Sequence, residues 1–154
     1  MLVLLVALVF AALLLGSWTI QTVDRYLQTA TSVRGLRFDI DDITWEDSPR
    51  RLHLDLGITN EGALDVYLDH TRFSVYIAGN YVATNTDTDI SKTLAPQEDI
   101  VLPYVFTLRP FFADALRDGL AETGAVWALR GVIWVDVDGL RSDIPLVVRK
   151  EVTR

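Results

Sequence analysis

The chain has 154 residues, which is room for one domain and an additional segment. It contains no cysteine, so disulfide bridges, thiolate metal ligands and a cysteine nucleophile are excluded. Its net charge is −7, and a negative surface disfavours nucleic acid, because phosphate binding depends on clustered cations.

The charged residues form an unusual mixture. Only Lys92 and Lys150 are lysine among the basic residues, the others are arginine, and aspartate is much commoner than glutamate. This composition resembles that of proteins from salt-adapted archaea, in which surface carboxylates maintain solubility. A GC-rich genome, whose codons favour arginine and aspartate, would produce the same bias, so composition leaves both explanations open.

The first 23 residues carry no charged side chain, and positions 2–15 are uninterrupted apolar residues. A helix of about 20 such residues is roughly 30 Å long, which matches the hydrocarbon core of a bilayer. A cleaved signal peptide is the alternative, but the segment lacks a basic start and a convincing small-residue cleavage pair. We therefore predict a membrane anchor over residues 1–23, with anchor positions at Leu2, Leu5, Phe10, Leu15 and Trp18.

Basic residues follow this segment and none precedes it. Arg25, Arg34 and Arg37 come soon after it, so the positive-inside rule favours a cytoplasmic location for the rest of a single-pass protein. An exported domain is the alternative, and a basic segment lost through a misassigned start would favour it. Residues 24–34 are polar and are predicted to be a linker or a helix extension, which leaves residues 35–154 for the folded domain.

From residue 36 onward, hydrophobic and polar residues alternate in short runs. A period of two is typical of half-buried strands, because successive side chains point to opposite faces of a sheet. One extra residue at Asp41-Asp42 shifts the alternation and predicts a β-bulge. The predicted strands of this part cover residues 36–45, 51–59, 64–68, 71–78, 81–83 and 100–108.

The last third of the chain predicts a helix and a hairpin. Residues 110–122 have apolar positions spaced by three and four, which is typical of a short amphipathic helix. Strands over 127–137 and 144–148 follow, and Asp138-Gly139 between them favours a type I′ turn, as Gly79-Asn80 does earlier. The whole pattern predicts an all-β, antiparallel sandwich of about 7–8 strands, similar to immunoglobulin and fibronectin III domains.

Several turns resemble those of a known family. Asn60 lies in the first of them, Gly79 and Asn80 lie in a Tyr-x-x-x-Asn-Tyr-Val-Ala segment, and Leu94 and Pro96 precede a strand rich in Val and Leu. These features resemble the group-2 late embryogenesis abundant (LEA type 2) domain, also called the water stress and hypersensitive response (WHy) domain. The resemblance extends over about residues 36–150.

This sequence departs from the family pattern in three turns. Only Asn60 remains of the usual Asn-Pro-Asn turn, Thr84 stands where glycine is common, and Ala95 and Pro96 are exchanged. The resemblance implies a non-enzymatic protein without a cofactor, connected with desiccation, osmotic or cold tolerance, that stabilises proteins or membranes. The alternatives are an interaction subunit of a membrane or cell-envelope assembly, docked through a strand edge, and a lipid-contacting module.

The sequence contains one weak candidate for a metal site. Asn85, Asp87 and Asp89 alternate like the first ligands of a calcium loop, but Ile90 and Pro96 stand where an EF-hand requires Gly and Glu. A row of solvated carboxylates is the alternative. No Gly-x-Ser-x-Gly motif or phosphate-binding loop is present, so we predict no catalytic residue. The densest acidic patch is interpreted as a solvated sheet edge, and it comprises Asp39, Asp41, Asp42, Glu46 and Asp47.

Val132 and Trp134 are the unexpected apolar residues. They alternate with Leu129, Ile133 and Val135, so if those three face the core, Val132 and Trp134 point away from it. Either the predicted helix covers them or they form an interaction surface.

Overall fold

The computed structural model describes residues 22–48 and 50–152. The predicted anchor over residues 1–23 lies almost entirely outside them, and within the described residues no helix has the length and apolar character that crossing a bilayer requires. The described part begins with a helix over residues 22–34. It continues with β1 (Leu36–Glu46), β2 (Arg51–Asn60), β3 (Val66–Ile77), β4 (Asn80–Leu94), β5 (Asp99–Thr107), α2 (Pro110–Ala121), β6 (Val126–Val137) and β7 (Leu140–Glu151).

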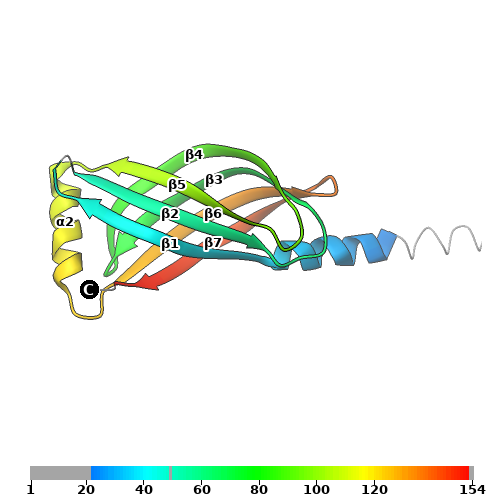
Figure 1. The fold of residues 1–154 in the computed structure, drawn as a ribbon, viewed down its shortest axis with the longest axis horizontal. Helices are drawn as coiled ribbons and strands as arrows, with labels where there is room; N and C mark the ends of the chain where they lie inside the picture. Colours follow the sequence, from blue (N-terminus) through cyan, green and yellow to red (C-terminus); the bar gives the residue numbers. More distant parts are fainter. Residues whose placement is uncertain (1–21, 49, 153–154) are drawn as a thin grey trace, which may run out of the picture.

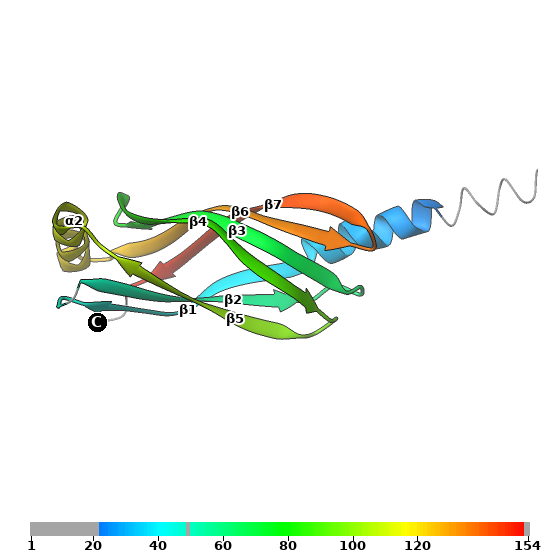
Figure 2. The same cartoon turned by 90° about the horizontal axis from the view of Figure 1, so that it is seen from above.

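The strands form two antiparallel sheets that pack face to face (Figure 1 and Figure 2). One sheet has three strands in the order β1-β2-β5, and the other has four in the order β4-β3-β6-β7. The chain changes sheets three times, and α2 lies in the last of these connections, between β5 and β6. The all-β, antiparallel fold and the helix before the last hairpin are therefore as predicted.

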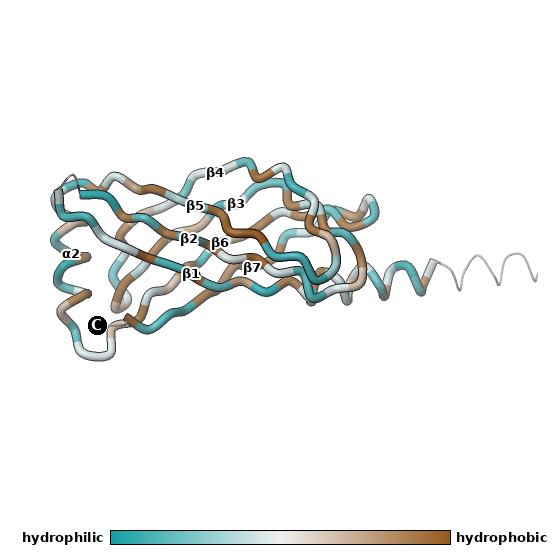
Figure 3. The backbone as a smooth tube through the Cα atoms, viewed as in Figure 1, coloured by the Kyte–Doolittle hydropathy of each residue, from teal (hydrophilic) through white to brown (hydrophobic). Residues whose placement is uncertain are grey.

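The interior is built from the inward-facing residues of both sheets. Leu54 and Leu56 of the smaller sheet and Phe73 and Ile133 of the larger one are at most 1% exposed. The ring of Phe73 meets that of Tyr104 edge-on, with centroids 4.9 Å apart, and so joins the two sheets. Hydrophobic and hydrophilic residues alternate along the strands in Figure 3, and burial of each large apolar side chain contributes about 1.5–3 kcal/mol.

The β-bulge predicted in the first strand is confirmed. The pairing of β1 with β2 shifts register between Ile40 and Asp42, so Asp41 is the additional residue. The carboxylate of Asp41 lies over Gly57. A Cβ atom added to Gly57 would be only 2.6 Å from Oδ1 of Asp41. Lys150 of β7 donates from Nζ to the carbonyl oxygens of Ile40 and Asp41, at 2.6 Å each. The bulge therefore joins β1 to β7 of the other sheet.

Two predictions for β3 and β4 are wrong. The runs over 64–68 and 71–78 form one strand, because Asp69 is accommodated as a register shift between Leu68 and His70. β4 extends far beyond the predicted residues 81–83, because pairing with β3 maintains it through a polar stretch in which burial does not alternate. Asp87 and Ser91 have φ angles of 43° and 50° and mark two of the three irregularities in its pairing with β3.

The two hairpin turns differ in their agreement with the prediction. Asp138 and Gly139 form the β6–β7 turn, with φ angles of 55° and 81°, as predicted. The β3–β4 turn lies one residue earlier than predicted. Its turn residues are Ala78 and Gly79, with φ angles of 46° and 82°, and Asn80 is already paired with Ile77. Two consecutive positive φ angles are typical of a type I′ turn, which matches the twist of paired strands.

The two helices lie at opposite ends of the sandwich (Figure 1). α2 buries Ala113, Leu116 and Gly119, and a Cβ atom on Gly119 would lie 2.7 Å from Cγ2 of Ile77. This close approach requires glycine at that position of the helix. The predicted apolar face of the helix is therefore the one that packs against the sheets.

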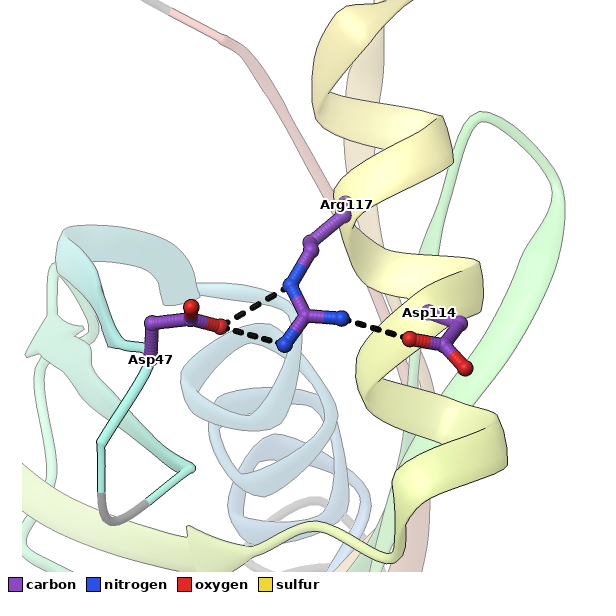
Figure 4. Close-up of polar contacts among 3 residues, drawn as sticks. All are labelled: Asp47, Asp114 and Arg117. Atoms are coloured by element: carbon purple, nitrogen blue, oxygen red, sulfur yellow. Dashed lines mark hydrogen bonds and ion pairs between the residues drawn. The ribbon is translucent and has the colours of Figure 1, made fainter.

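Arg117 links α2 to the turn between β1 and β2 through hydrogen bonds (Figure 4). Its Nε and Nη2 donate to Oδ1 of Asp47 at 2.9 and 2.6 Å, and its Nη1 donates to Oδ1 of Asp114 at 2.5 Å. The hydrogen bonds to Asp47 are the main reason that the pKa of Arg117 is raised. Asp47, which the sequence placed in a solvated acidic patch, therefore has a structural partner.

The helix over residues 22–34 is attached to the domain near both of its ends. Arg25 forms an ion pair with Asp138 in the β6–β7 turn. Near the other end, Ser32 is fully buried, and its Oγ accepts a hydrogen bond from the N–H of Leu64 at 3.2 Å. Of the two forms predicted for residues 24–34, a linker and a helix extension, the segment therefore adopts the helix.

Candidate interaction surface on the larger sheet

Val132 and Trp134 lie on the outer face of the four-stranded sheet, half-buried rather than in the core. α2 does not cover them, because it packs at the end of the sandwich against β3 and β4. Trp134 instead stacks on His70 of β3, with ring centroids 4.1 Å apart and an angle of 12° between the rings. The interpretation in which the helix covers these residues is therefore wrong. The inward positions of the same strand are taken by Leu129, Ile133 and Val135.

Three arginines share this outer face. Arg72 of β3, Arg130 of β6 and Arg149 of β7 are all exposed. None of the three forms an ion pair within the part of the chain that the structure describes. We call this surface the arginine face and define it as Arg72, Tyr76, Arg130, Val132, Trp134, Val147 and Arg149.

An aromatic side chain holds one of these arginines in place. Cζ of Arg130 lies 5.3 Å from the centroid of the Tyr76 ring, which is a cation–π contact. Tyr76 is supported by Tyr81 of β4, at 5.9 Å between centroids, and Tyr81 by Phe112 of α2, at 5.3 Å. Stacking orders the guanidinium but leaves its N–H donors available, so Arg130 is prepared to bind a carboxylate or a phosphate.

The arginine face contains two hollows. A groove of about 520 Å³ near the α2 end of the sheet is lined by both cations and carboxylates, among them Arg130, Arg149, Glu122 and Glu151. A smaller hollow of about 270 Å³ lies beside His70 and Trp134 toward the other end. Both are open to solvent along the sheet, so they suit side chains of a partner better than an enclosed small molecule.

The outer face of the three-stranded sheet is rich in carboxylates, whereas that of the larger sheet holds Asp136, Asp143 and Glu151 among its arginines. Asp42 of β1 is paired directly with Asp55 of β2, an arrangement of like charges that destabilises a sheet. We call this surface the acidic face. Its carboxylates are those of Asp39, Asp41, Asp42, Glu46, Asp55 and Asp99, with Arg37 and Arg51 as basic neighbours.

The candidate metal residues do not converge on one point. Asn85 is buried, donates from Nδ2 to Oγ1 of Thr71 at 3.0 Å, and accepts at Oδ1 from Oγ1 of Thr88 at 2.6 Å. Asp87 and Asp89 are exposed. Among the described residues, no three His, Asp or Glu side chains are grouped so that they could hold a metal ion. The side chain of Asn85 is therefore engaged in structural hydrogen bonds with Thr71 and Thr88.

Asn60, one of the turn residues that resemble those of the family, lies at the end of the sandwich near the helix over residues 22–34 and has a structural role. Asn60 is fully buried, donates from Nδ2 to the carbonyls of Leu64 and Leu94 at 2.9 and 3.0 Å, and accepts from the N–H of Gly62 at 2.9 Å. This amide joins the β2–β3 turn to the end of β4, next to Pro96. Gly79 and Asn80 lie far away, in the hairpin near α2.

Comparison with known proteins shows the fold alone. No protein-family model matches the chain, and no curated protein matches it. A protein from Arabidopsis thaliana, solved in solution, is 15% identical with a TM-score of 0.52, over 77% of this chain and 78% of that one. A candidate late embryogenesis abundant protein is 12% identical with a TM-score of 0.49, over 91% and 82%. A protein from Archaeoglobus fulgidus is 14% identical with a TM-score of 0.42, over 77% and 94%.

Proposed function

We propose that this chain is a membrane-anchored, non-enzymatic β-sandwich of the LEA type 2 (WHy) kind that protects other proteins or membranes by binding them. The observation that carries the proposal is the arginine face, where Arg130 and Trp134 are presented on a rigid sheet. Arginine, tryptophan and tyrosine dominate the energetics of binding surfaces, because each combines apolar area with hydrogen-bond donors. The turns around Asn60 and Leu94, which resemble those of the family, add to this support.

The course of the chain suggests how such a domain would stand at a membrane. The helix over residues 22–34 leaves the sandwich at the end opposite α2 (Figure 2). If residues 1–23 cross a bilayer, the strands extend away from it and the arginine face stands at its side. This orientation favours protein partners over contact of the face with the headgroups of the same membrane.

A second candidate function is that of an interaction subunit in a membrane or cell-envelope assembly. The strand edges are poorly suited to pairing with an added strand. β5 and β7 carry Pro103 and Pro145, which lack an N–H, and β1 and β4 are irregular at Asp41 and Asp87. An assembly partner would therefore bind a sheet face instead of extending a sheet.

Anchoring and orientation are tested together by cysteine labelling. The chain has no cysteine, so an exposed single substitution, Asp87→Cys, gives one reactive thiol. For a cytoplasmic domain, a membrane-impermeant maleimide labels this thiol only after lysis, whereas an exported domain is labelled in intact cells. Alkaline extraction should leave the full chain in the membrane and release a variant without residues 1–23. Release of the full chain would contradict the anchor.

Protection is tested with the full chain and a labile enzyme. We expect the protein in mild detergent to preserve the enzyme through drying or freezing better than an inert acidic protein at the same concentration. Arg130→Ala combined with Trp134→Ala should reduce the effect. The matched control is Arg51→Ala with Val105→Ala on the other sheet. If the enzyme loses as much activity with this chain as with the inert protein, protection is not its function.

A further inference from the structure

We infer that a groove between the helix over residues 22–34 and the start of β7 binds the headgroup of an anionic phospholipid. The helix lies at the end of the sandwich opposite α2 (Figure 1). Such a lipid comes from the bilayer in which residues 1–23 would be anchored, so the inference rests on that part of the proposed function. We call this site the helix groove. Its walls include Tyr26, Ala30, Val33 and Arg34 of the helix and Leu140 and Arg141 of β7.

The helix groove is held in shape by the attachment of the helix to the sandwich. Arg25 forms an ion pair with Asp138, two residues before β7 begins, and Ser32 is fully buried. Thr29 between them is also buried, and its Oγ1 donates to the carbonyl of Arg25 at 3.0 Å. The groove has a volume of about 290 Å³. This is enough room for the phosphate and glycerol of one headgroup, held between two fixed elements.

The charged residues that line the groove are both arginines, and none of its lining residues is acidic. Arg34 is exposed and forms no ion pair within residues 22–48 and 50–152. Nε of Arg141 lies 3.9 Å from Oδ2 of Asp136, which is too long for a hydrogen bond, so its N–H donors remain available. The neighbouring carboxylate of Asp138 is already paired with Arg25. Two guanidinium groups with free donors fit a phosphate, which they bind through parallel N–H bonds.

Apolar side chains beside these arginines favour a lipid over a soluble phosphate. Val23, Tyr26 and Leu27 of the helix are 52%, 67% and 59% exposed, and Leu140 at the start of β7 is 41% exposed. Residues 1–21 carry no charged side chain, and the chain passes from them directly into this helix. A soluble phosphate would leave the apolar side chains in water. The glycerol and acyl region of a lipid would cover them, which is favourable.

The groove also begins at the level of the headgroups. A helix rises 1.5 Å per residue, so if the anchor ends at residue 23, Tyr26 lies about 5 Å beyond it. The headgroup layer is about 5–7 Å thick on each side of the hydrocarbon core, and tyrosine is enriched there. Arg34 begins about 16 Å beyond the anchor, but side chains of a helix lean toward its N-terminus, which is the membrane end here. A headgroup can therefore enter beside Tyr26 and extend toward Arg34.

The experiment counts lipids bound to the full chain by native mass spectrometry in non-ionic detergent. Phosphatidylglycerol and phosphatidylcholine are titrated separately. We expect one phosphatidylglycerol per chain, bound at least about tenfold more tightly than phosphatidylcholine, whose choline cation opposes the two arginines. Arg34→Ala with Arg141→Ala should reduce this preference to within about twofold, whereas Arg34→Lys with Arg141→Lys should retain most of it. Tyr26→Ala should weaken binding of both lipids, because it removes an apolar wall without changing the charge.

Arg50→Ala with Arg109→Ala is the matched control, because it makes the same change of charge at exposed positions at the α2 end. This pair should bind phosphatidylglycerol as the unmodified chain does. An equal loss in the control would show diffuse attraction to anionic lipid and would overturn the inference. Glycerol phosphate, which lacks acyl chains, should not displace the lipid at equal concentration, and displacement would assign the groove to a soluble phosphate instead.

Alkaline extraction tests the anchor separately from the groove. A chain that stays in the membrane but binds the two lipids equally would overturn the inference and leave the anchor intact. Release of the full chain would contradict the anchor, and with it the supply of lipid to the groove.

Discussion

The hydroxyl of Tyr104 on β5 lies 3.3 Å from Oγ1 of Thr71 on β3, so a polar contact joins the two sheets inside an apolar core. Oγ1 of Thr71 also accepts a hydrogen bond from Nδ2 of Asn85 at 3.0 Å, which brings β4 into the same network. Burial raises the pKa of Tyr104, and the contact with Thr71 opposes that shift. The network fixes which residues of β3, β4 and β5 face one another.

Thr71→Val should destabilise the protein more than Tyr104→Phe. The valine leaves the Tyr104 hydroxyl buried without its partner and removes one of the two acceptors of Asn85 Nδ2, which keeps the Thr71 carbonyl at 3.3 Å, so the cost is about 2 kcal/mol. The phenylalanine removes one weak hydrogen bond and leaves Thr71 paired with Asn85, so it costs about 1 kcal/mol. Urea denaturation measures both, with Thr107→Val as the exposed control. Equal losses from the two variants would show that the three residues do not act as a network.

Gly131→Ala should destabilise the larger sheet. A Cβ atom at this position would lie 2.1 Å from the carbonyl oxygen of Arg72 and 2.6 Å from Cβ of Phe73, so β3 and β6 would have to separate. We expect a loss of about 2–4 kcal/mol in the free energy of unfolding, by the usual cost of overpacking and backbone displacement. Ala128→Ser on the same strand is the control. A change within about 0.5 kcal/mol would contradict the close packing of these strands.

Attachment of the helix over residues 22–34 should weaken in acid. The hydrogen bond from Arg25 lowers the pKa of Asp138 in the folded protein. An aspartate in the unfolded chain has a pKa of about 3.9, so the ion pair contributes fully above that value. The contribution is lost as the pH falls through the lower pKa of the folded state.

Hydrogen exchange of residues 22–34, corrected for the intrinsic rate at each pH, measures this attachment. Protection should decrease between about pH 4 and about pH 2 in the unmodified chain. Asp138→Asn should show the reduced protection at every pH, and Asp143→Asn should behave like the unmodified chain. Asparagine tolerates the positive φ of the turn, so the substitution tests the charge and not the backbone. Protection that is insensitive to pH in the unmodified chain would show that Arg25 is dispensable.

Pro103→Val should increase aggregation. Proline at the centre of the edge strand β5 cannot donate a hydrogen bond to an added strand, whereas valine can. Val101 and Val105 on either side are exposed, so the substitution creates a continuous apolar edge. Thioflavin T fluorescence and light scattering during incubation measure the effect, and Val101→Thr added to Pro103→Val should partly reverse it. Unchanged solubility of Pro103→Val would show that other features protect this edge.

The agreement between sequence and structure follows the physical origin of each signal. Alternation of apolar residues predicted β1, β2, β5, β6 and β7, because in each of these strands about every second side chain is fully or partly buried. It failed for β4, where partner hydrogen bonds maintain a polar strand that buries few of its residues. At Asn85 the sequence left two readings open, because a buried amide and a metal ligand look alike until the position of Thr71 is known.

By itself, the sequence determined the class of the fold, the bulge at Asp41, the Asp138-Gly139 turn and the absence of a cysteine site. Those features depend on the period of two, on residues that tolerate positive φ and on composition, all of which are local. Only the tertiary structure decided that Trp134 stacks on His70 and is not covered by α2. It alone also gathered Arg72, Arg130 and Arg149 on one face. Long-range strand pairing brings those residues together, and pairing partners far apart in the chain are not encoded in any short stretch of it.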